Sequence, residues 1–110
     1  MKKSILVAIA DIKLSSLIRK SIIKTGCKAV GARTENEAIK LIQRKSVDLL
    51  LLDIKFLVKD RQLKTILDEI QLPYVIITND KDEQKALTAV KDGAMDYLLL
   101  NKGFLPLLAH

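Results

Sequence analysis

The sequence contains little of what stabilises a small secreted domain. Its 110 residues include one cysteine, four glycines, two prolines, four aromatic residues and no tryptophan. A single cysteine excludes an internal disulfide and fits a reducing compartment, so we expect a cytoplasmic location. No apolar run approaches the roughly 20 residues that a membrane-spanning helix requires. No low-complexity linker divides the chain, and its length allows one domain.

The scarcity of histidine argues against hydrolase and oxidoreductase chemistry. His110 is the only histidine and stands last in the sequence. The sequence has no Gly-rich phosphate loop, and no Ser-His-Asp or Cys-His arrangement can be assembled, so we do not expect an enzyme. The net charge of +6 leaves a basic nucleic-acid-associated domain as a minor alternative. The basic residues are spread along the chain without interleaved aromatic residues, so direct nucleic-acid binding is not favoured.

The most informative segment is the apolar run at 47–55, which reads VDLLLLDIK. Four consecutive leucines between segments of helical periodicity are typical of a strand covered on both faces, as in a parallel sheet. Asp53 then falls at the carboxyl end of this strand. Open α/β sheets place their chemistry at that edge, so Asp53 is the first candidate for a functional residue.

Strands and helices are predicted to alternate along the whole chain. An apolar strand and a helix with its hydrophobic residues on one side recur at short spacing, which predicts an α/β fold with a parallel sheet and right-handed crossovers. The strands are expected at 4–10, 28–32, 48–53, 74–78 and 95–100, and the helices at 14–22, 35–44, 63–70 and about 82–92.

The end of the sequence offers little for a covering helix. Only ten residues follow Leu100, and Pro106 interrupts them, so the final helix is expected to be short or missing. We expect a single domain, 1–110. Either its fold ends without a full final helix, or the sequence is a fragment of a longer protein. A fifth strand without its helix would expose an apolar strip and invite a partner.

Three features occur together in the order that is typical of one family. Asp53 ends the third strand, Thr78 ends the fourth, and Gly93–Leu98 reads GAMDYL before the fifth. From residue 2 to about 104 the chain resembles the receiver domain of two-component response regulators. The resemblance implies a flavodoxin-like, doubly wound sheet in the order 2-1-3-4-5. It also implies that Asp53 accepts a phosphoryl group, Thr78 supplies a switch hydroxyl and Tyr97 is an aromatic switch.

The metal site of that family is altered in this sequence. The resemblance implies Mg²⁺ held by acidic residues after the first strand, but Ile9 and Ala10 stand at those positions. Asp11 follows one position late. It is either a helix cap or, together with Asp53 and the backbone carbonyl of Lys55, a weak metal ligand. Magnesium binding is therefore expected to be weak or absent.

The phosphoryl-contacting lysine is displaced as well. A direct alignment puts Leu100 at its position, and Lys102 is a candidate substitute if the loop carries a two-residue insertion. The segment after Asp53 lacks the family's proline and glycine and is expected to be a loop. In this loop Lys55 or Lys59 either pairs with Asp53 or is simply solvated.

We therefore expect a degenerate, pseudo-receiver type of domain in phosphorelay signalling. It would act by protein–protein contact through the helix at 82–92 and the fifth strand, with a sensor histidine kinase, an output domain or a second copy as partner. The alternative is a phosphorylation-competent receiver in which Asp11 and Lys102 take over the missing roles.

Overall fold

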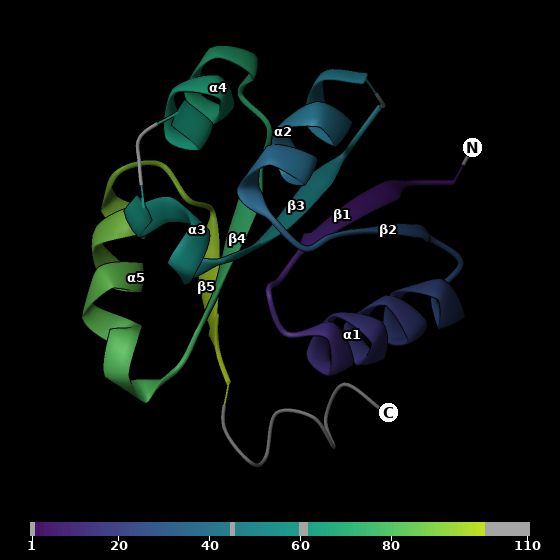
Figure 1. The fold of residues 1–110 in the computed structure, drawn as a ribbon, viewed down its shortest axis with the longest axis horizontal. Coiled ribbons are helices and arrows are strands. Elements are labelled where there is room, and N and C mark those ends of the chain that lie inside the picture. Colours follow the sequence, from purple (N-terminus) through teal and green to yellow (C-terminus); the bar gives the residue numbers. More distant parts are fainter. Residues whose placement is uncertain (1, 45, 60–61, 101–110) are drawn as a thin grey trace.

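The computed structural model describes residues 2–44, 46–59 and 62–100, and its centre is a five-stranded sheet (Figure 1). All strand pairs are parallel, in the order β2-β1-β3-β4-β5. The strands are β1 (Ser4–Ala8), β2 (Lys28–Ala32), β3 (Leu49–Asp53), β4 (Tyr74–Thr78) and β5 (Asp96–Leu99). The predicted doubly wound, flavodoxin-like arrangement is confirmed.

Helices connect these strands, and their bounds follow local capping signals. At the start of the second helix, the Glu37 amide donates to Thr34 Oγ1 at 3.2 Å, so Thr34 caps the helix, and the Thr34 hydroxyl donates to Glu37 Oε1 at 3.4 Å. No described helix has the length and apolar composition needed to cross a membrane. The helices are α1 (Ile12–Lys24), α2 (Glu35–Arg44), α3 (Ile54–Lys59), α4 (Gln62–Ile70), the 3₁₀ helix η1 (Asp80–Asp82) and α5 (Glu83–Lys91).

The segment that follows Asp53 is helical, so the expectation of a loop there was wrong. Helix α3 begins at Ile54, directly after β3. Ile54 and Phe56 are only 3% and 5% exposed, because they pack into the core beneath the helix. The segment contains neither proline nor glycine, so nothing in it interrupts a helix once these side chains are buried.

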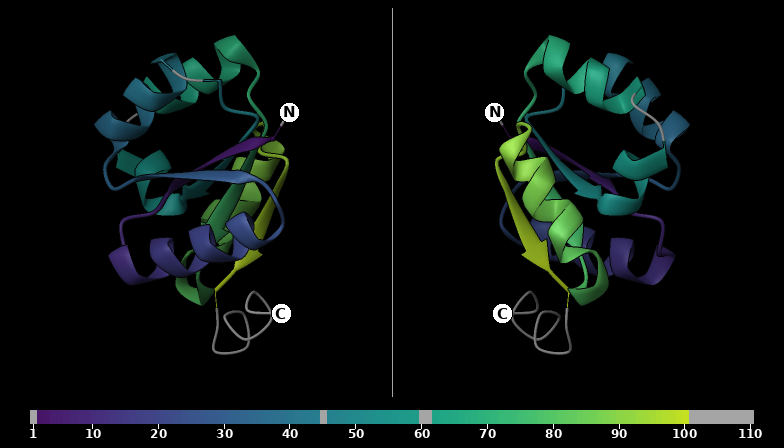
Figure 2. Two further views of the ribbon diagram at one scale, coloured as in Figure 1. Left: turned by 90° about the vertical axis from the view of Figure 1, so that its right-hand side faces the viewer. Right: turned by 90° about the vertical axis from the view of Figure 1, so that its left-hand side faces the viewer.

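The two faces of the sheet are covered unequally. Helices α2, α3, α4 and α5 pack on one face, and among the described helices α1 alone packs on the other (Figure 2). Leu6, Leu50, Leu52 and Ile76 point into the larger core and are fully buried. Since side chains alternate along a strand, the leucines of β3 serve both faces, which explains the unbroken apolar run.

The β5 edge of the sheet exposes apolar side chains. Leu98 in β5 is 38% exposed and Met95, just before the strand, is 60% exposed. Both lie on the part of the sheet where an apolar strip was expected from the sequence. The expectations about the final helix, and about Pro106 and His110, concern residues 101–110, which lie outside the described residues.

Candidate functional site at the carboxyl edge of the sheet

A small cavity of about 200 Å³ lies at the carboxyl ends of β1, β3 and β4. It gathers Asp53, Thr78, Asp11 and Lys55, four of the residues that the sequence singled out. Lys102 is outside the described residues, and Tyr97 does not line the cavity. The lining residues are Asp11, Leu14, Asp53, Ile54, Lys55, Ile77, Thr78, Asn79 and Leu100.

The carboxylate of Asp53 is fixed by two backbone amides. The Ala10 amide donates to Oδ2 at 3.2 Å, and the Lys55 amide donates to Oδ1 at 3.1 Å. The first contact arises because β1 and β3 are neighbours in the sheet, and the second because α3 begins directly after the strand. Lys55 therefore contacts Asp53 through its backbone. The described residues contain no ion pair to Asp53, and the side chain of Lys59 is not described.

Asp11 is a helix cap as well as a wall of the cavity. Its Oδ1 accepts the Leu14 amide at 3.0 Å, which places it at the N-cap of α1. This bond satisfies one of the free amides of the first turn. The preceding Ile9 is 1% exposed and packs between the sheet and α1, and Ala10 is exposed. Neither side chain brings an oxygen to the cavity.

A resident magnesium ion fits these residues poorly. Mg²⁺ requires nearly octahedral oxygen ligands. The cavity offers the carboxylates of Asp11 and Asp53, and both Asp53 oxygens and one Asp11 oxygen already accept amide hydrogen bonds. Within the described ranges there is no group of three or more acidic, histidine or cysteine side chains that could hold a metal. Among the described residues, Asp11 and Asp53 are therefore the two acidic side chains that line the cavity.

Leu100, Thr78 and Asn79 also line the cavity. The Leu100 backbone amide donates to the Thr78 carbonyl at 2.6 Å, which continues the β4–β5 pairing. Thr78 is 2% exposed, and its hydroxyl reaches the Asn79 carbonyl only at a long 3.4 Å. Asn79 Oδ1 accepts the Asp82 amide at 3.1 Å and so caps η1. Thr78 thus retains a weakly held hydroxyl beside Asp53.

Tyr97 contacts Glu83, a residue that no motif in the sequence indicated. Its hydroxyl donates to Glu83 Oε2 at 2.8 Å, and this hydrogen bond raises the pKa of Tyr97. The two residues are 14 positions apart, so no local pattern in the sequence pairs them. The ring packs against the larger core. The structure therefore shows Tyr97 bound to the start of α5.

The sequence profile of the response regulator receiver domain matches residues 5–104 of the chain. The chain belongs to this family. Receivers are signalling modules of two-component systems, and the order of Asp53, Thr78 and the GAMDYL segment is that of a receiver. The search of curated proteins returned no significant match.

Solved structures share the same fold. NtrX from Brucella abortus is 25% identical with a TM-score of 0.80, and the match covers 99% of this receiver but 26% of the NtrX chain. A two-component response regulator from Clostridium difficile is 27% identical with a TM-score of 0.79, covering 98% and 93% of the two chains. A response regulator receiver protein from Pseudomonas putida is 22% identical with a TM-score of 0.78, covering 99% and 96%. The receiver thus spans about a quarter of NtrX and nearly all of the other two chains.

Proposed function

We propose that this receiver is an atypical one, which signals by contact with a partner protein and in which magnesium-dependent phosphorylation of Asp53 is lost or much weakened. One observation carries the proposal. Both carboxylate oxygens of Asp53 accept backbone amides, and in the described part of the chain Asp11 is the only other carboxylate that lines the cavity. The scaffold of the family is retained, and among the described residues Ile9 and Ala10 bring no charged group to the positions of its acidic pair.

The chemistry explains why these losses matter. A carboxylate that attacks a phosphoryl group needs a metal ion and fixed donors to neutralise the charge on the transferring group. Removing one such electrostatic stabiliser commonly reduces a rate by about 10² to 10³. Here Ile9 and Ala10 supply no ligand, and Leu100 lines the wall where a receiver would have its lysine. A large combined deficit is expected, although such effects need not add.

Intact-mass measurement after incubation with acetyl phosphate and Mg²⁺ tests this proposal. We expect no gain of a phosphoryl group by the wild-type chain, as in Asp53→Asn. Ala10→Asp returns a carboxylate at an exposed position next to Asp53, so this variant should bind Mg²⁺ more tightly and gain some phosphoryl group. Stoichiometric phosphorylation of the wild-type chain at Asp53 would refute the proposal.

A competent receiver that uses Asp11 and Lys102 is the second candidate, because Asp11 and Asp53 line the same cavity. Magnesium titration distinguishes the two candidates. Asparagine caps helices about as well as aspartate, so Asp11→Asn removes the charge and keeps the cap. Submillimolar Mg²⁺ binding that disappears in Asp11→Asn would favour the competent site. Equal and weak binding by both chains would favour the atypical one.

The partner surface of this proposal is formed by α5 and β5, which lie side by side (Figure 2). Leu87 in α5, Leu98 in β5 and Met95 just before β5 are exposed apolar side chains that a partner could cover. A sensor kinase, an output domain such as a longer regulator carries, or a second copy would bind there. If the partner is a second copy, sedimentation should show a dimer that Leu98→Gln weakens. Ile23→Gln, at an exposed position on α1, is the matched control.

A further inference from the structure

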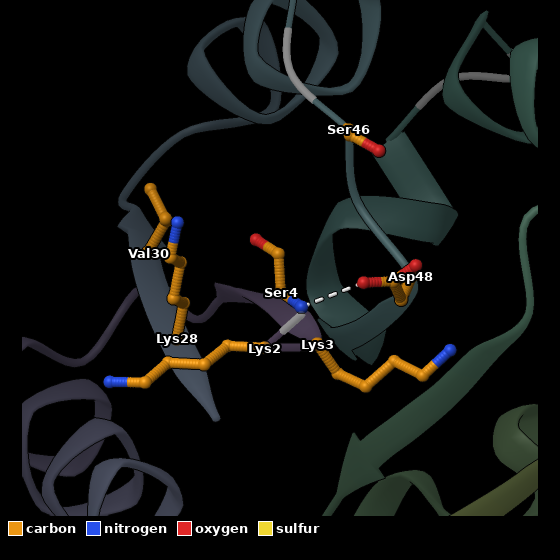
Figure 3. A pocket seen from close by; sticks show the side chains of 7 residues that line it. All are labelled: Lys2, Lys3, Ser4, Lys28, Val30, Ser46 and Asp48. Carbon is orange, nitrogen blue, oxygen red and sulfur yellow. Dashed lines mark hydrogen bonds between the residues drawn. The ribbon is translucent and has the colours of Figure 1, made fainter. Parts of the chain in front are cut away.

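A second and larger cavity, of about 470 Å³, lies at the opposite edge of the sheet, where β1 and β2 begin. Ser46 and Asp48, which precede β3, also line it (Figure 3). It is remote from Asp53, which ends β3 at the carboxyl edge. The lining residues are Lys2, Lys3, Ser4, Lys28, Val30, Ser46 and Asp48. Nothing in the phosphorylation chemistry of a receiver uses this edge.

Hydrogen bonds between three chain segments fix the base of this cavity. The Ser4 amide donates to Asp48 Oδ2 at 2.7 Å, and the Asp48 amide donates to the Ser4 carbonyl at 2.8 Å. The Lys28 amide donates to the Lys3 carbonyl at 2.8 Å, in register with the β1–β2 pairing. One oxygen of Asp48, the only carboxylate among the described residues that line the cavity, is thereby engaged by a backbone amide. The base is preorganised before any ligand arrives.

Within the described residues, no ion pair is found to the lysines of this cavity. Lys2, Lys3 and Lys28 are exposed, and the ion pairs found among the described residues are Lys64–Asp68 and Lys85–Asp82. Three ammonium groups against one carboxylate leave an excess of positive charge in a small hollow. An excess of positive charge of this kind attracts anions.

The directions of the side chains indicate the shape of that anion. In Figure 3 the Lys28 ammonium and the Ser4 hydroxyl extend to the same side of the sheet edge, whereas Lys2 and Lys3 extend in opposite directions along it. A single phosphate could reach only part of this set. A chain of phosphates could contact several ammonium groups at once, since each is a flexible point charge with three donors.

We propose that this cavity binds a linear polyphosphate group of three or more phosphates, contacted by Lys2, Lys3 and Lys28 and by the hydroxyls of Ser4 and Ser46. Free tripolyphosphate and the phosphate chain of a nucleoside triphosphate share this chemistry. Val30 contributes an apolar surface beside the lysine stems. A nucleoside could rest there, so the two sources are separated by experiment.

Amide chemical-shift titration of the full chain at low ionic strength, without Mg²⁺ or a phosphodonor, tests the proposal. Tripolyphosphate should shift the amides of Ser4, Lys28 and Asp48 and leave those of Lys55 and Thr78 unchanged. Inorganic phosphate should bind more weakly, and added sodium chloride should weaken the binding of both. Tighter binding of ATP than of tripolyphosphate would identify the nucleotide as the source, and equal binding would identify the phosphate chain alone.

A pair of variants distinguishes tripolyphosphate binding at this cavity from general electrostatic attraction of the anion to a basic protein. Lys28→Gln removes a cavity charge, and Lys81→Gln removes an exposed charge from η1 at the other edge, so both variants have the same net charge. Lys28→Gln should weaken tripolyphosphate binding about three- to fivefold, the effect of one exposed charge contact. Lys81→Gln should leave it unchanged.

Three outcomes would overturn the inference: equal losses in both variants, shifts spread over the whole surface, or tighter Lys28-dependent binding of a single-stranded oligonucleotide. The last would assign the cavity to nucleic acid instead. The titration is repeated with Asp53→Asn, a variant that cannot be phosphorylated at position 53. Its result is therefore independent of the proposed signalling function.

Discussion

The two tyrosine residues differ in what their hydroxyl groups contact. Tyr74 is 3% exposed, and its hydroxyl has no hydrogen-bond partner among the described residues. Burial raises the pKa of Tyr74, although the nearby Lys64 ammonium opposes this. The Tyr97 hydroxyl donates to Glu83, and that hydrogen bond is the main cause of its raised pKa. The sequence indicated Tyr97 as a functional residue but gave no sign of either environment.

Spectrophotometric titration of the phenol groups checks these two environments. The chain has no tryptophan, so absorbance near the phenolate band reports only Tyr74 and Tyr97. Both should titrate above the ordinary pKa of about 10. Since the folded pKa values exceed the unfolded ones, their stabilising contribution is complete below pH ~10 and is lost as the pH rises through the folded values. Tyr74→Phe and Tyr97→Phe assign the two transitions, and an ordinary pKa for either residue would contradict its environment.

At the scale of elements, helix ends account for much of what could be predicted. Gly93 has a φ of 130°, a conformation that side chains disfavour, and it lets the chain leave α5 and enter β5. Ala94 and Met95 then donate amide hydrogen bonds to the carbonyls of Ala89 and Tyr74. Residues such as Gly93 that end a helix act over a few neighbouring positions and can be recognised in the sequence. The bounds of β2, α2 and β4 were accordingly predicted correctly. The α3 helix was missed because burial against the core stabilises it.

The cap of α1 gives a prediction at this scale. Asp11→Ala removes the hydrogen bond to the Leu14 amide and should lower the free energy of unfolding by about 1 kcal/mol. Asp11→Asn keeps an acceptor at the same place and should leave stability nearly unchanged. Urea denaturation of the three proteins measures the difference. An equal loss in both variants would show that charge, rather than the cap, stabilises this end of the helix.

At the scale of the whole molecule, the sheet separates two cores of different size. The larger core contains residues from β1, β3 and β4 and from the four helices on that face, and the smaller one is formed by α1 and the opposite face. Because β3 is central, its side chains contribute to both cores. Stability is therefore expected to depend more on β3 than on β5, which lies at the edge and is partly exposed.

Truncation of one leucine in each of these strands tests that dependence. Leu52 is fully buried, so Leu52→Ala should destabilise the protein by about 2–5 kcal/mol through lost burial and a new cavity. Leu98 is 38% exposed, and Leu98→Ala should cost distinctly less. Thermal or urea unfolding compares the two variants. Similar losses would mean that the β5 edge is more tightly packed than the structure shows.

The sequence by itself determined the fold, the family and the position of Asp53 at the end of a strand. Hydrophobic periodicity, the glycines that end helices and the ends of strands are local properties, so short stretches of sequence contain them. Only the tertiary structure decided what surrounds that carboxylate. The amide of Ala10 and the side chains of Thr78 and Leu100 reach the cavity from other strands or their ends. Lys28 likewise lines the same cavity as Lys2 and Lys3 only because the parallel strands β1 and β2 begin side by side. Contacts between segments depend on the register of the sheet, and no short stretch of sequence contains that information.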